Sequence, residues 1–378
     1  MKRDYQICTN CVMDTTDSNI TFNEQGVCDH CIDFEKDVKN KWFPNEEGRL
    51  RLKKTVANIK KDGKNREFDC ILGMSGGVDS SYMLHLAVKE LGLRPLVFHV
   101  DSGWNSEQAV KNIQLMIDKL GLDLYTEVIN WEEMKDLQLS FFKSGVPHLD
   151  IPQDMAYMAT LFNFANKNNI KYILNGGNIS TECVRNPMEW IYYGTDMMQM
   201  KDIIKKFSTI KFNSFPFLPI LKHKLYLRYF KGLKMIRPLD NMVYNKKFAS
   251  DLLEKEYGWK PYPQKHFESR FTKFYEGYWL PERFGFDTRK IQFSSLILTK
   301  QMTRDEAIEE LKKSPFNKEK IDDEFKFIAT KLGISSEKLR YYFNLPKKFY
   351  WDYKNQQNLF NIGAKILKIL GVEKSIKR

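Results

Sequence analysis

The sequence predicts an α/β protein with a doubly wound parallel sheet, preceded by a metal-binding ribbon and followed by a mostly helical region. Three observations predict this fold class. Short apolar runs alternate with amphipathic segments from residue 68, a glycine-rich turn follows the first apolar run, and four cysteines stand near the start of the chain. Alternating strands and helices favour a parallel sheet covered on both faces. Ligands bind such sheets beyond the carboxyl ends of the strands.

Short apolar runs predict the strands, and apolar residues at helical spacing predict the helices between them. Strands are expected at residues 69–72, 95–100, 124–129 and 172–174, and helices at about 80–91, 106–120, 131–142 and 153–166. From residue 185 aromatic and basic residues dominate, and no clear strand order is expected there. Further helices are expected at residues 246–257, 304–313, 318–332, 336–343 and 357–370.

The run Ser-Gly-Gly-Val-Asp-Ser at residues 75–80 joins the first predicted strand to the first predicted helix. A glycine turn at a helix start binds anions through backbone N–H groups. Asp79 would repel a phosphate unless a cation lay between them, and Mg²⁺ is the natural bridge. The run is neither a Walker loop nor a dinucleotide fingerprint. A tight turn without a ligand is the competing interpretation. The candidate phosphate-binding residues are Ser75, Gly76, Gly77, Val78, Asp79 and Ser80.

Polar residues also follow the second and fourth predicted strands, at the same edge of the sheet. His99 and Asp101 end the second strand and could contact ribose, adenine or Mg²⁺. A core histidine and a helix cap are the alternative roles. A second glycine turn follows the fourth strand, where a plain loop before a helix is the competing interpretation. The candidate nucleotide-binding residues of this turn are Gly176, Gly177, Asn178 and Glu182.

Four of the six cysteines form two Cys-x2-Cys pairs, Cys8 with Cys11 and Cys28 with Cys31. In a cytoplasmic protein such pairs indicate a metal site rather than disulfides, and two knuckles complete a tetrahedral shell for Zn²⁺. An iron–sulfur cluster and free thiols are the competing interpretations. Four thiolates leave no open coordination position, so the zinc ion is expected to stabilise the fold rather than to take part in chemistry.

The chain has 378 residues, with 60 Lys and Arg against 48 Asp and Glu, and a formal net charge of +12. This charge favours anionic partners, although solvated helix faces in a lysine-rich protein are the plainer interpretation of the basic runs at 201–211, 222–234 and 374–378. No apolar run approaches the roughly 20 residues that span a bilayer. The first residues lead into cysteines rather than an apolar signal segment, so a cytoplasmic protein is expected.

Residues 75–80 resemble the pyrophosphate loop (PP-loop) of the ATP pyrophosphatases, a superfamily that includes GMP synthetase, asparagine synthetase, NAD synthetase and tRNA thiolation enzymes. Together with other runs, the sequence resembles the N-acetyl sugar amidotransferases of bacterial surface-polysaccharide and flagellin-glycan pathways. The resemblance covers residues 1 to about 313. The runs that carry it are the two cysteine pairs and residues 75–80, 101–105, 152–154, 176–182 and 265–269.

The resemblance implies four regions: a zinc-binding ribbon (1–33), a helical linker (34–67), an ATP pyrophosphatase domain (68–235) and a mostly helical, substrate-binding C-terminal region (236–378). It also implies an ATP-dependent, AMP-forming enzyme that converts the acetamido group of a nucleotide-activated sugar to an acetamidino group. Adenylation of the amide oxygen would create the leaving group that ammonia displaces. The implied catalytic residues are Asp79 with Mg²⁺, Lys265 for the charge of pyrophosphate, and His266 and Glu268 as proton carriers.

No glutaminase is visible in the sequence, so ammonia is expected to be free or to come from a separate subunit. The resemblance suggests a glutaminase like that of histidine biosynthesis, with its barrel companion as a further candidate partner. No nucleic-acid partner is expected. The alternative function is tRNA modification of the thiolation type, which uses the same adenylating chemistry on a base. A non-catalytic zinc-ribbon interaction protein would leave the glycine turn unexplained.

Overall fold

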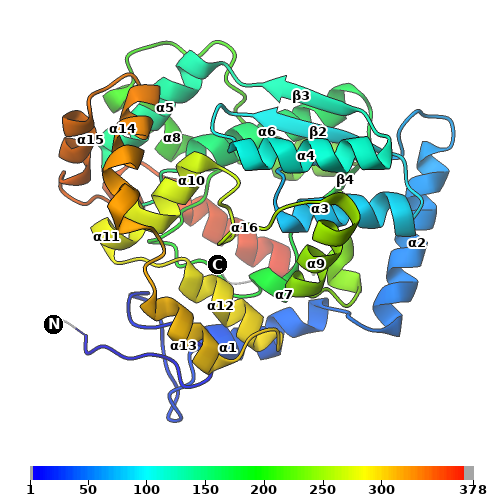
Figure 1. The fold of residues 1–378 in the computed structure, drawn as a ribbon, viewed down its shortest axis with the longest axis horizontal. Coiled ribbons are helices and arrows are strands. Elements are labelled where there is room, and N and C mark those ends of the chain that lie inside the picture. The colour runs from blue at the N-terminus through cyan, green and yellow to red at the C-terminus, as the bar shows by residue number, and fades with distance from the viewer. Residues whose placement is uncertain (1–2, 370–378) are drawn as a thin grey trace.

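Five parallel strands form one sheet in the order β3-β2-β1-β4-β5 (Figure 1). The structure is a computed structural model that describes residues 3–369, so the basic run at 374–378 lies outside the described residues. β1 pairs with β2 on one side and with β4 on the other, and the direction of winding therefore reverses between β1 and β4. The strands are β1 Cys70–Gly73, β2 Pro95–Asp101, β3 Leu124–Val128, β4 Tyr172–Leu174 and β5 Lys234–Ile236.

The two faces of the sheet belong to two separate apolar clusters. In β1, Cys70 and Leu72 join one cluster and Ile71 joins the other, because successive side chains of a strand point to opposite faces. Helices on both faces bury β1, β2 and β4, as a doubly wound fold requires, whereas the edge strand β3 stays partly exposed. The first cluster, which contains Cys70 and Leu72, is covered by α2 Glu46–Gly63, α3 Val78–His85, α4 Glu107–Leu120 and α9 Lys246–Tyr257. The second cluster, which contains Ile71, is covered by α5 Trp131–Ser144 and α6 Ile151–Lys167.

The N-terminal ribbon and the C-terminal helices pack on the second cluster. In Figure 1 the ribbon and α1 lie beside α12 and α13, although more than 250 residues of chain separate them. The remaining helices are α1 Asp29–Asp33, α7 Ile179–Glu182, α8 Met197–Phe207, α10 Arg270–Phe274, α11 Leu280–Phe284, α12 Arg289–Leu298, α13 Arg304–Lys312, α14 Ile321–Lys331, α15 Ser336–Phe343 and α16 Gln357–Ile369.

The predicted fold class is confirmed, and four strands lie within one or two residues of their expected positions. β5 was not expected, because its three residues lie in a basic and aromatic stretch without strand periodicity. β5 also crosses the predicted domain boundary at residue 235, so the sheet continues into the region assigned to the C-terminal part. None of the helices between residues 3 and 369 combines the length and apolarity that a membrane span requires.

Candidate active site

The turn between β1 and α3 has the geometry that the sequence predicts. Gly76 has a φ of +84°, which a residue with a Cβ rarely adopts, and a Cβ there would lie 2.9 Å from the carbonyl oxygen of Ala109. α3 begins at Val78 without a side-chain cap, so no side chain accepts from the N–H groups of its first turn. The Oγ atoms of Ser75 and Ser80 lie 3.1 Å apart at the mouth of the turn. Backbone and hydroxyl donors therefore converge on one point.

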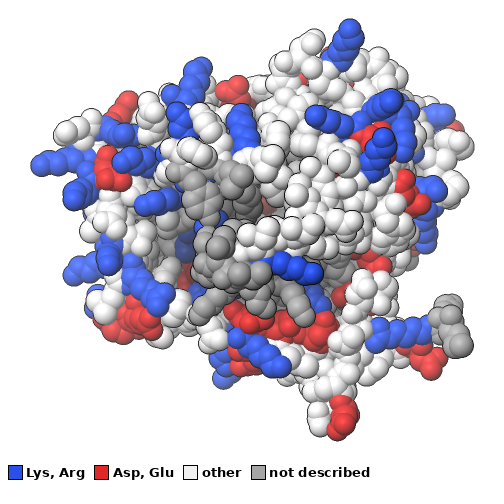
Figure 2. Space-filling view, turned by 180° about the vertical axis from the view of Figure 1, so that it is seen from behind, with Lys and Arg blue, Asp and Glu red and all other residues white. Residues whose placement is uncertain are grey.

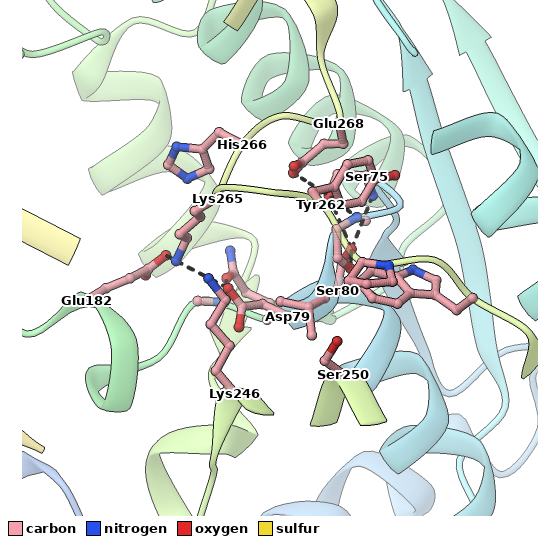
Figure 3. Close-up of a pocket in the computed structure, with 18 of the residues that line it drawn as sticks. Ser75, Asp79, Ser80, Glu182, Lys246, Ser250, Tyr262, Lys265, His266 and Glu268 are labelled. Carbon is pink, nitrogen blue, oxygen red and sulfur yellow. Dashed lines mark hydrogen bonds and ion pairs between the residues drawn. The ribbon is translucent and has the colours of Figure 1, made fainter. Parts of the chain in front are cut away.

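A cavity of about 260 Å³ opens beside this turn, at the point where the winding of the sheet reverses. We call it the loop cavity. Its walls come from the turns after β1 and β4, from α9 and from residues 259–268 (Figure 3). The residues of interest that line it are Ser75, Gly77, Val78, Asp79, Ser80, Gly176, Gly177, Glu182, Lys246, Ser250, Tyr262, Lys265, His266 and Glu268.

The glycine turn after β4 packs directly on the turn after β1. A Cβ on Gly176 would lie 2.7 Å from the backbone carbonyl of Asp79, so a larger residue would push the two turns apart. Asn178 accepts from the Thr181 N–H at 2.9 Å and caps α7, and its Nδ2 donates to Asp79 Oδ1 at 3.3 Å. Asn178 is fully buried and is not among the residues that line the loop cavity. It positions Asp79 instead of facing a ligand.

The ammonium group of Lys265 joins two carboxylates inside the loop cavity (Figure 3). Its Nζ lies 3.1 Å from Asp79 Oδ2 and 2.5 Å from Glu182 Oε1. Tyr244 donates its hydroxyl to Asp79 Oδ1 at 2.5 Å. Burial acts to raise the pKa of Asp79, but Lys265 and Tyr244 outweigh it and hold that pKa below its usual value. Both Asp79 and Lys265 are therefore charged at neutral pH.

The segment that carries Lys265, His266 and Glu268 reaches the site because its backbone is fastened to the end of β2. The Ser106 N–H donates to the carbonyl oxygen of Glu268 at 2.9 Å, and the Arg270 N–H donates to that of Trp104 at 2.8 Å. The Glu268 side chain then accepts from Ser75 Oγ at 3.2 Å. Two runs of sequence almost 200 residues apart thus form one wall of the loop cavity.

His266 occupies the junction of three cavities. Its backbone has a φ of +68°, which is unusual for a residue other than glycine, and its Nδ1 lies 3.2 Å from Glu276 Oε1. Burial alone would lower the pKa of His266, but the Glu276 carboxylate more than offsets this and raises it to about 9. The ring is therefore an imidazolium at neutral pH, which donates a proton or binds an anion rather than accepting a proton.

Two further cavities adjoin the loop cavity. A strand cavity of about 420 Å³ lies at the end of β2 and shares Gly73, Ser75, Leu161, His266 and Glu268 with the loop cavity. A side cavity of about 440 Å³ lies between the segment after α7 and α12, and shares Glu182, Lys265 and His266 with the loop cavity. Among the described residues, His266 alone lines all three. A ligand that spans the three cavities would therefore bend around His266.

His99 and Asp101 take structural roles at the end of β2. The Nδ1–H of His99 donates to the Met74 carbonyl at 2.7 Å, and its Nε2 accepts from Asn105 at 2.9 Å. His99 lines the strand cavity but not the loop cavity. Asp101 Oδ1 accepts from the Gly103 N–H at 2.8 Å and from Asn105, which fixes the turn after β2. The structure places Asp101 outside the three cavities, contrary to the expected contact with nucleotide or Mg²⁺.

Four site residues were not predicted from the sequence, and they share one origin. They come from α9 and the segments on either side of it, which the sequence presents as an ordinary helix and its loops. Lys246 projects from the start of α9 toward Asp79 (Figure 3), and burial lowers the pKa of Lys246 even though Asp79 opposes the shift. No local sequence pattern marks these residues, because they reach the loop cavity only through the packing of α9 on α3. They are Tyr244, Lys246, Ser250 and Tyr262.

The four ribbon cysteines lie together and are buried. Sγ–Sγ distances are 3.8 Å between Cys8 and Cys31, 3.6 Å between Cys11 and Cys28, and 3.6 Å between Cys28 and Cys31. Four sulfurs at about 2.3 Å from one tetrahedral ion would lie about 3.8 Å apart, so the cluster fits a single metal ion. The backbone N–H groups of Cys11 and Cys28 also point to Cys8 Sγ, as in a metal-binding knuckle. These four residues could hold a metal ion.

Two parts of the chain match known families. Residues 69–147 match the phosphoadenosine phosphosulfate reductase domain, and residues 268–367 match the C-terminal domain of the family described as LPS biosynthesis protein WbpG-like. The chain joins a PP-loop domain to a WbpG-like C-terminal domain. The PP-loop domain supplies the turn at residues 75–80, and the WbpG-like domain supplies Glu276, Thr288 and Gln292 to the side cavity. No match was found among curated proteins.

Solved structures with a detectable likeness have low overall similarity. The NH3-dependent NAD synthetase from Campylobacter jejuni is 18% identical with a TM-score of 0.27, and the match covers 35% of this chain and 57% of that one. The U34-tRNA thiolase NcsA from Methanococcus maripaludis, solved with its [4Fe-4S] cluster, is 14% identical with a TM-score of 0.31, covering 69% and 75%. NMN synthetase from Francisella tularensis is 15% identical with a TM-score of 0.28, covering 58% and 94%.

Proposed function

We propose that the protein is an ATP-dependent, AMP-forming amidotransferase that converts the acetamido group of a nucleotide-activated sugar to an acetamidino group, in the synthesis of a surface polysaccharide or flagellin glycan. The observation that carries the proposal is the contact between the PP-loop and the WbpG-like domain, in which Ser75 Oγ donates to Glu268 at 3.2 Å. The loop cavity would bind the β- and γ-phosphates, and the strand cavity, which continues from Ser75 past Phe98 and Val100, would take the nucleoside.

The reaction needs activation because an amide carbon is a poor electrophile. The acetamido oxygen attacks the α-phosphorus, the bond from the α-phosphorus to the bridging oxygen breaks, and pyrophosphate leaves. Ammonia then adds to the imidate carbon, the C–O bond breaks, AMP leaves and a proton is lost. The protein's part is to stabilise the charge on pyrophosphate and on AMP, which falls to Lys265, Lys246 and the imidazolium of His266. Glu268 is the candidate acceptor for the proton from ammonia.

Asp79 and Glu182 are the residues that would hold Mg²⁺. Their carboxylates face one another across a single cation position, which the Lys265 ammonium fills in this structure. Bound Mg²⁺ would neutralise phosphate charge that the two carboxylates otherwise repel. For the ribbon we propose Zn²⁺, because four buried thiols at tetrahedral spacing suit that ion. Since all four positions of the shell are filled by protein, this ion would act on stability.

The burial of the cysteines supports amidation over thiolation. The six cysteines are all buried, four of them in the ribbon cluster. Burial raises the pKa of Cys183 to about 12, and its thiol lies 3.7 Å from the Ser295 carbonyl, so it is a poor carrier of sulfur. The face in Figure 2 shows Lys and Arg interspersed with Asp and Glu, rather than one basic surface for RNA.

The deciding experiment is turnover of the purified chain with ATP, Mg²⁺, ammonium chloride and a panel of UDP- and CMP-linked N-acetyl sugars. We expect AMP and pyrophosphate in equal amounts, and a sugar product in which one oxygen is replaced by NH, identified by mass spectrometry. Reactions that contain the matching sugars without the acetyl group are the control. AMP formation that is the same with and without an N-acetyl group would contradict the proposal. AMP formation that requires tRNA and sulfide would establish the thiolation alternative.

A further inference from the structure

The side cavity is electrically balanced, although it is lined by several basic residues. Arg185 is held by Asp29 and Asp33 of α1, and it is only 17% exposed. Arg237 lies 3.0 Å from Asp240 and also donates to the Gly177 carbonyl. Neither guanidinium group can bind a phosphate without giving up a carboxylate partner.

The two cations at the inner end of the side cavity, Lys265 and His266, also line the loop cavity. Lys265 lies between Asp79 and Glu182, and His266 faces Glu276. The walls that the side cavity does not share with the loop cavity hold Arg185 and Arg237, and both already have carboxylate partners. This arrangement favours an uncharged ligand with hydroxyl groups over a phosphate or a carboxylate.

Two side-chain amides supply the polar contacts that such a ligand would need. Gln292 of α12 is partly buried in the wall of the side cavity, and Asn186 lies where the side and strand cavities meet. Within residues 3–369, neither side-chain amide forms a hydrogen bond with another residue, and Asn186 is exposed. Each offers two donors and one acceptor. Val184, Ile191 and Ile291 provide apolar wall beside them.

We infer that the side cavity seats the uncharged sugar ring with its acetamido group, and that the phosphates of the sugar carrier stay outside it. The side cavity reaches the loop cavity at Lys265 and His266, so an acetamido oxygen at its inner end would lie where the α-phosphate arrives. This inference rests on the proposed function. It adds the location of the sugar and the groups that select it.

The location also assigns a role to the ribbon. Asp29 and Asp33 flank Cys31 and are the partners of Arg185, and Val38, five residues beyond the ribbon, lines the side cavity itself. The Arg304 guanidinium donates to the carbonyl oxygens of Cys8 and Cys11 and fastens the ribbon to α13. The ribbon thus supports one wall of the sugar site by holding Arg185. Its four cysteines do not line the side cavity and would not contact the sugar.

The test uses the full chain and two substitutions. Gln292→Leu removes one amide, and Gly194→Trp fills open space, because a Cβ on Gly194 has no atom within 4 Å. We expect the KM for the N-acetyl sugar to rise at least tenfold in each, with the Kd for ATP and the melting temperature within error of the parent. Gln114→Leu, the same change on the exposed surface of α4, is the matched control and should leave both constants unchanged.

Direct binding separates this inference from the proposed reaction. Saturation-transfer NMR would use the methyl glycosides of N-acetylglucosamine, N-acetylgalactosamine and N-acetylmannosamine, which carry no charge. We expect at least one to bind, and its signal to be lost in Gly194→Trp. Turnover with unchanged sugar KM in both variants would overturn the inference and leave the reaction standing, as would the absence of binding by all three glycosides. Binding that Gly194→Trp abolishes, without any AMP formation, would leave the site standing and overturn the reaction.

Discussion

At Lys265 one ammonium group serves two carboxylates from different turns of the sheet. Its side chain is 9% exposed, and that of Asp79 is 15% exposed. Charges so poorly hydrated persist only when they are paired, so Asp79 and Lys265 act as one unit, and the more exposed Glu182 adds a second carboxylate to Lys265. Tyr244 and Asn178 add hydrogen bonds to the same oxygen of Asp79. The carboxylate is therefore held in one orientation toward the loop cavity.

Replacement of Asp79 tests this unit at the level of one residue. In Asp79→Asn the side chain keeps its size but can neither pair with Lys265 nor hold Mg²⁺, so we expect AMP formation to fall about 100-fold or more. The measurement is kcat from pyrophosphate release, together with the melting temperature. Asp251→Asn, on the exposed side of α9, is the matched control and should keep the parent rate. An Asp79→Asn enzyme with parental kcat would remove Asp79 from the mechanism.

His266 gives a pH dependence whose sign follows from its partner. Because Glu276 raises the pKa of His266 to about 9, the imidazolium persists at neutral pH and is lost as the pH rises through that value. In Glu276→Gln the pKa should fall toward about 6.5 or lower. If catalysis needs the imidazolium, the alkaline limb of the kcat profile moves down with it, with roughly a 30-fold loss at pH 8.

The control for this prediction is Glu309→Gln, a matched change at an exposed ion pair of α13. Its kcat profile should superimpose on that of the parent. NMR titration of the His266 ring gives an independent value for the pKa. A profile in Glu276→Gln that keeps its alkaline limb near pH 9, while the ring titrates near 6.5, would show that the limb belongs to another group.

Among the elements, the ribbon contributes most to the site without touching the phosphates. Met13 and Ile20 of the ribbon pack in the apolar core, and polar contacts join the ribbon to the C-terminal helices. The Val12 N–H donates to Ser294 Oγ of α12, and Lys290 of the same helix pairs with Asp14. Because α12 also carries Gln292, loss of the metal should disturb the side cavity before it disturbs the loop cavity.

Removal of one ribbon thiol tests the metal site. In Cys28→Ser we expect loss of the bound zinc, measured by elemental analysis of the purified chain, and a melting temperature lower by roughly 5 °C or more. Cys70→Ala, which removes a cysteine from the core beside the sheet, should keep one zinc ion per chain. Zinc retained at parental stoichiometry in Cys28→Ser would contradict a four-thiolate site. Iron and sulfide in place of zinc would identify a cluster instead.

At the scale of the whole molecule, two distant stretches of chain divide the chemistry. The PP-loop domain contributes the glycine turn at residues 75–80, and the WbpG-like domain closes the strand and side cavities. The three cavities meet at His266, so the proposed activation and amination steps could share a single point. The proposed reaction also needs ammonia, and none of the six cysteines is exposed to act on glutamine. We therefore propose a separate glutaminase as partner.

This proposal predicts which nitrogen donor the isolated chain can use. We expect turnover with ammonium chloride, rising with pH as the free base accumulates, and no turnover with glutamine in place of ammonium. Glutamine should support the reaction only after addition of a glutaminase, and AMP formation in coupled mixtures reports this directly. Equal rates with glutamine and ammonium in the isolated, homogeneous chain would show that the protein carries its own glutaminase and needs no partner.

The sequence by itself determined the sheet, the glycine turn at residues 75–80 and the cysteine cluster, because each depends on residues close together in the chain. Strand periodicity, a glycine at positive φ and two Cys-x2-Cys pairs are local signals. The tertiary structure alone decided that Lys246 and Tyr244 join the site. This outcome depends on packing between segments more than 160 residues apart, which sets distances, burial and therefore pKa values, and no local pattern encodes it.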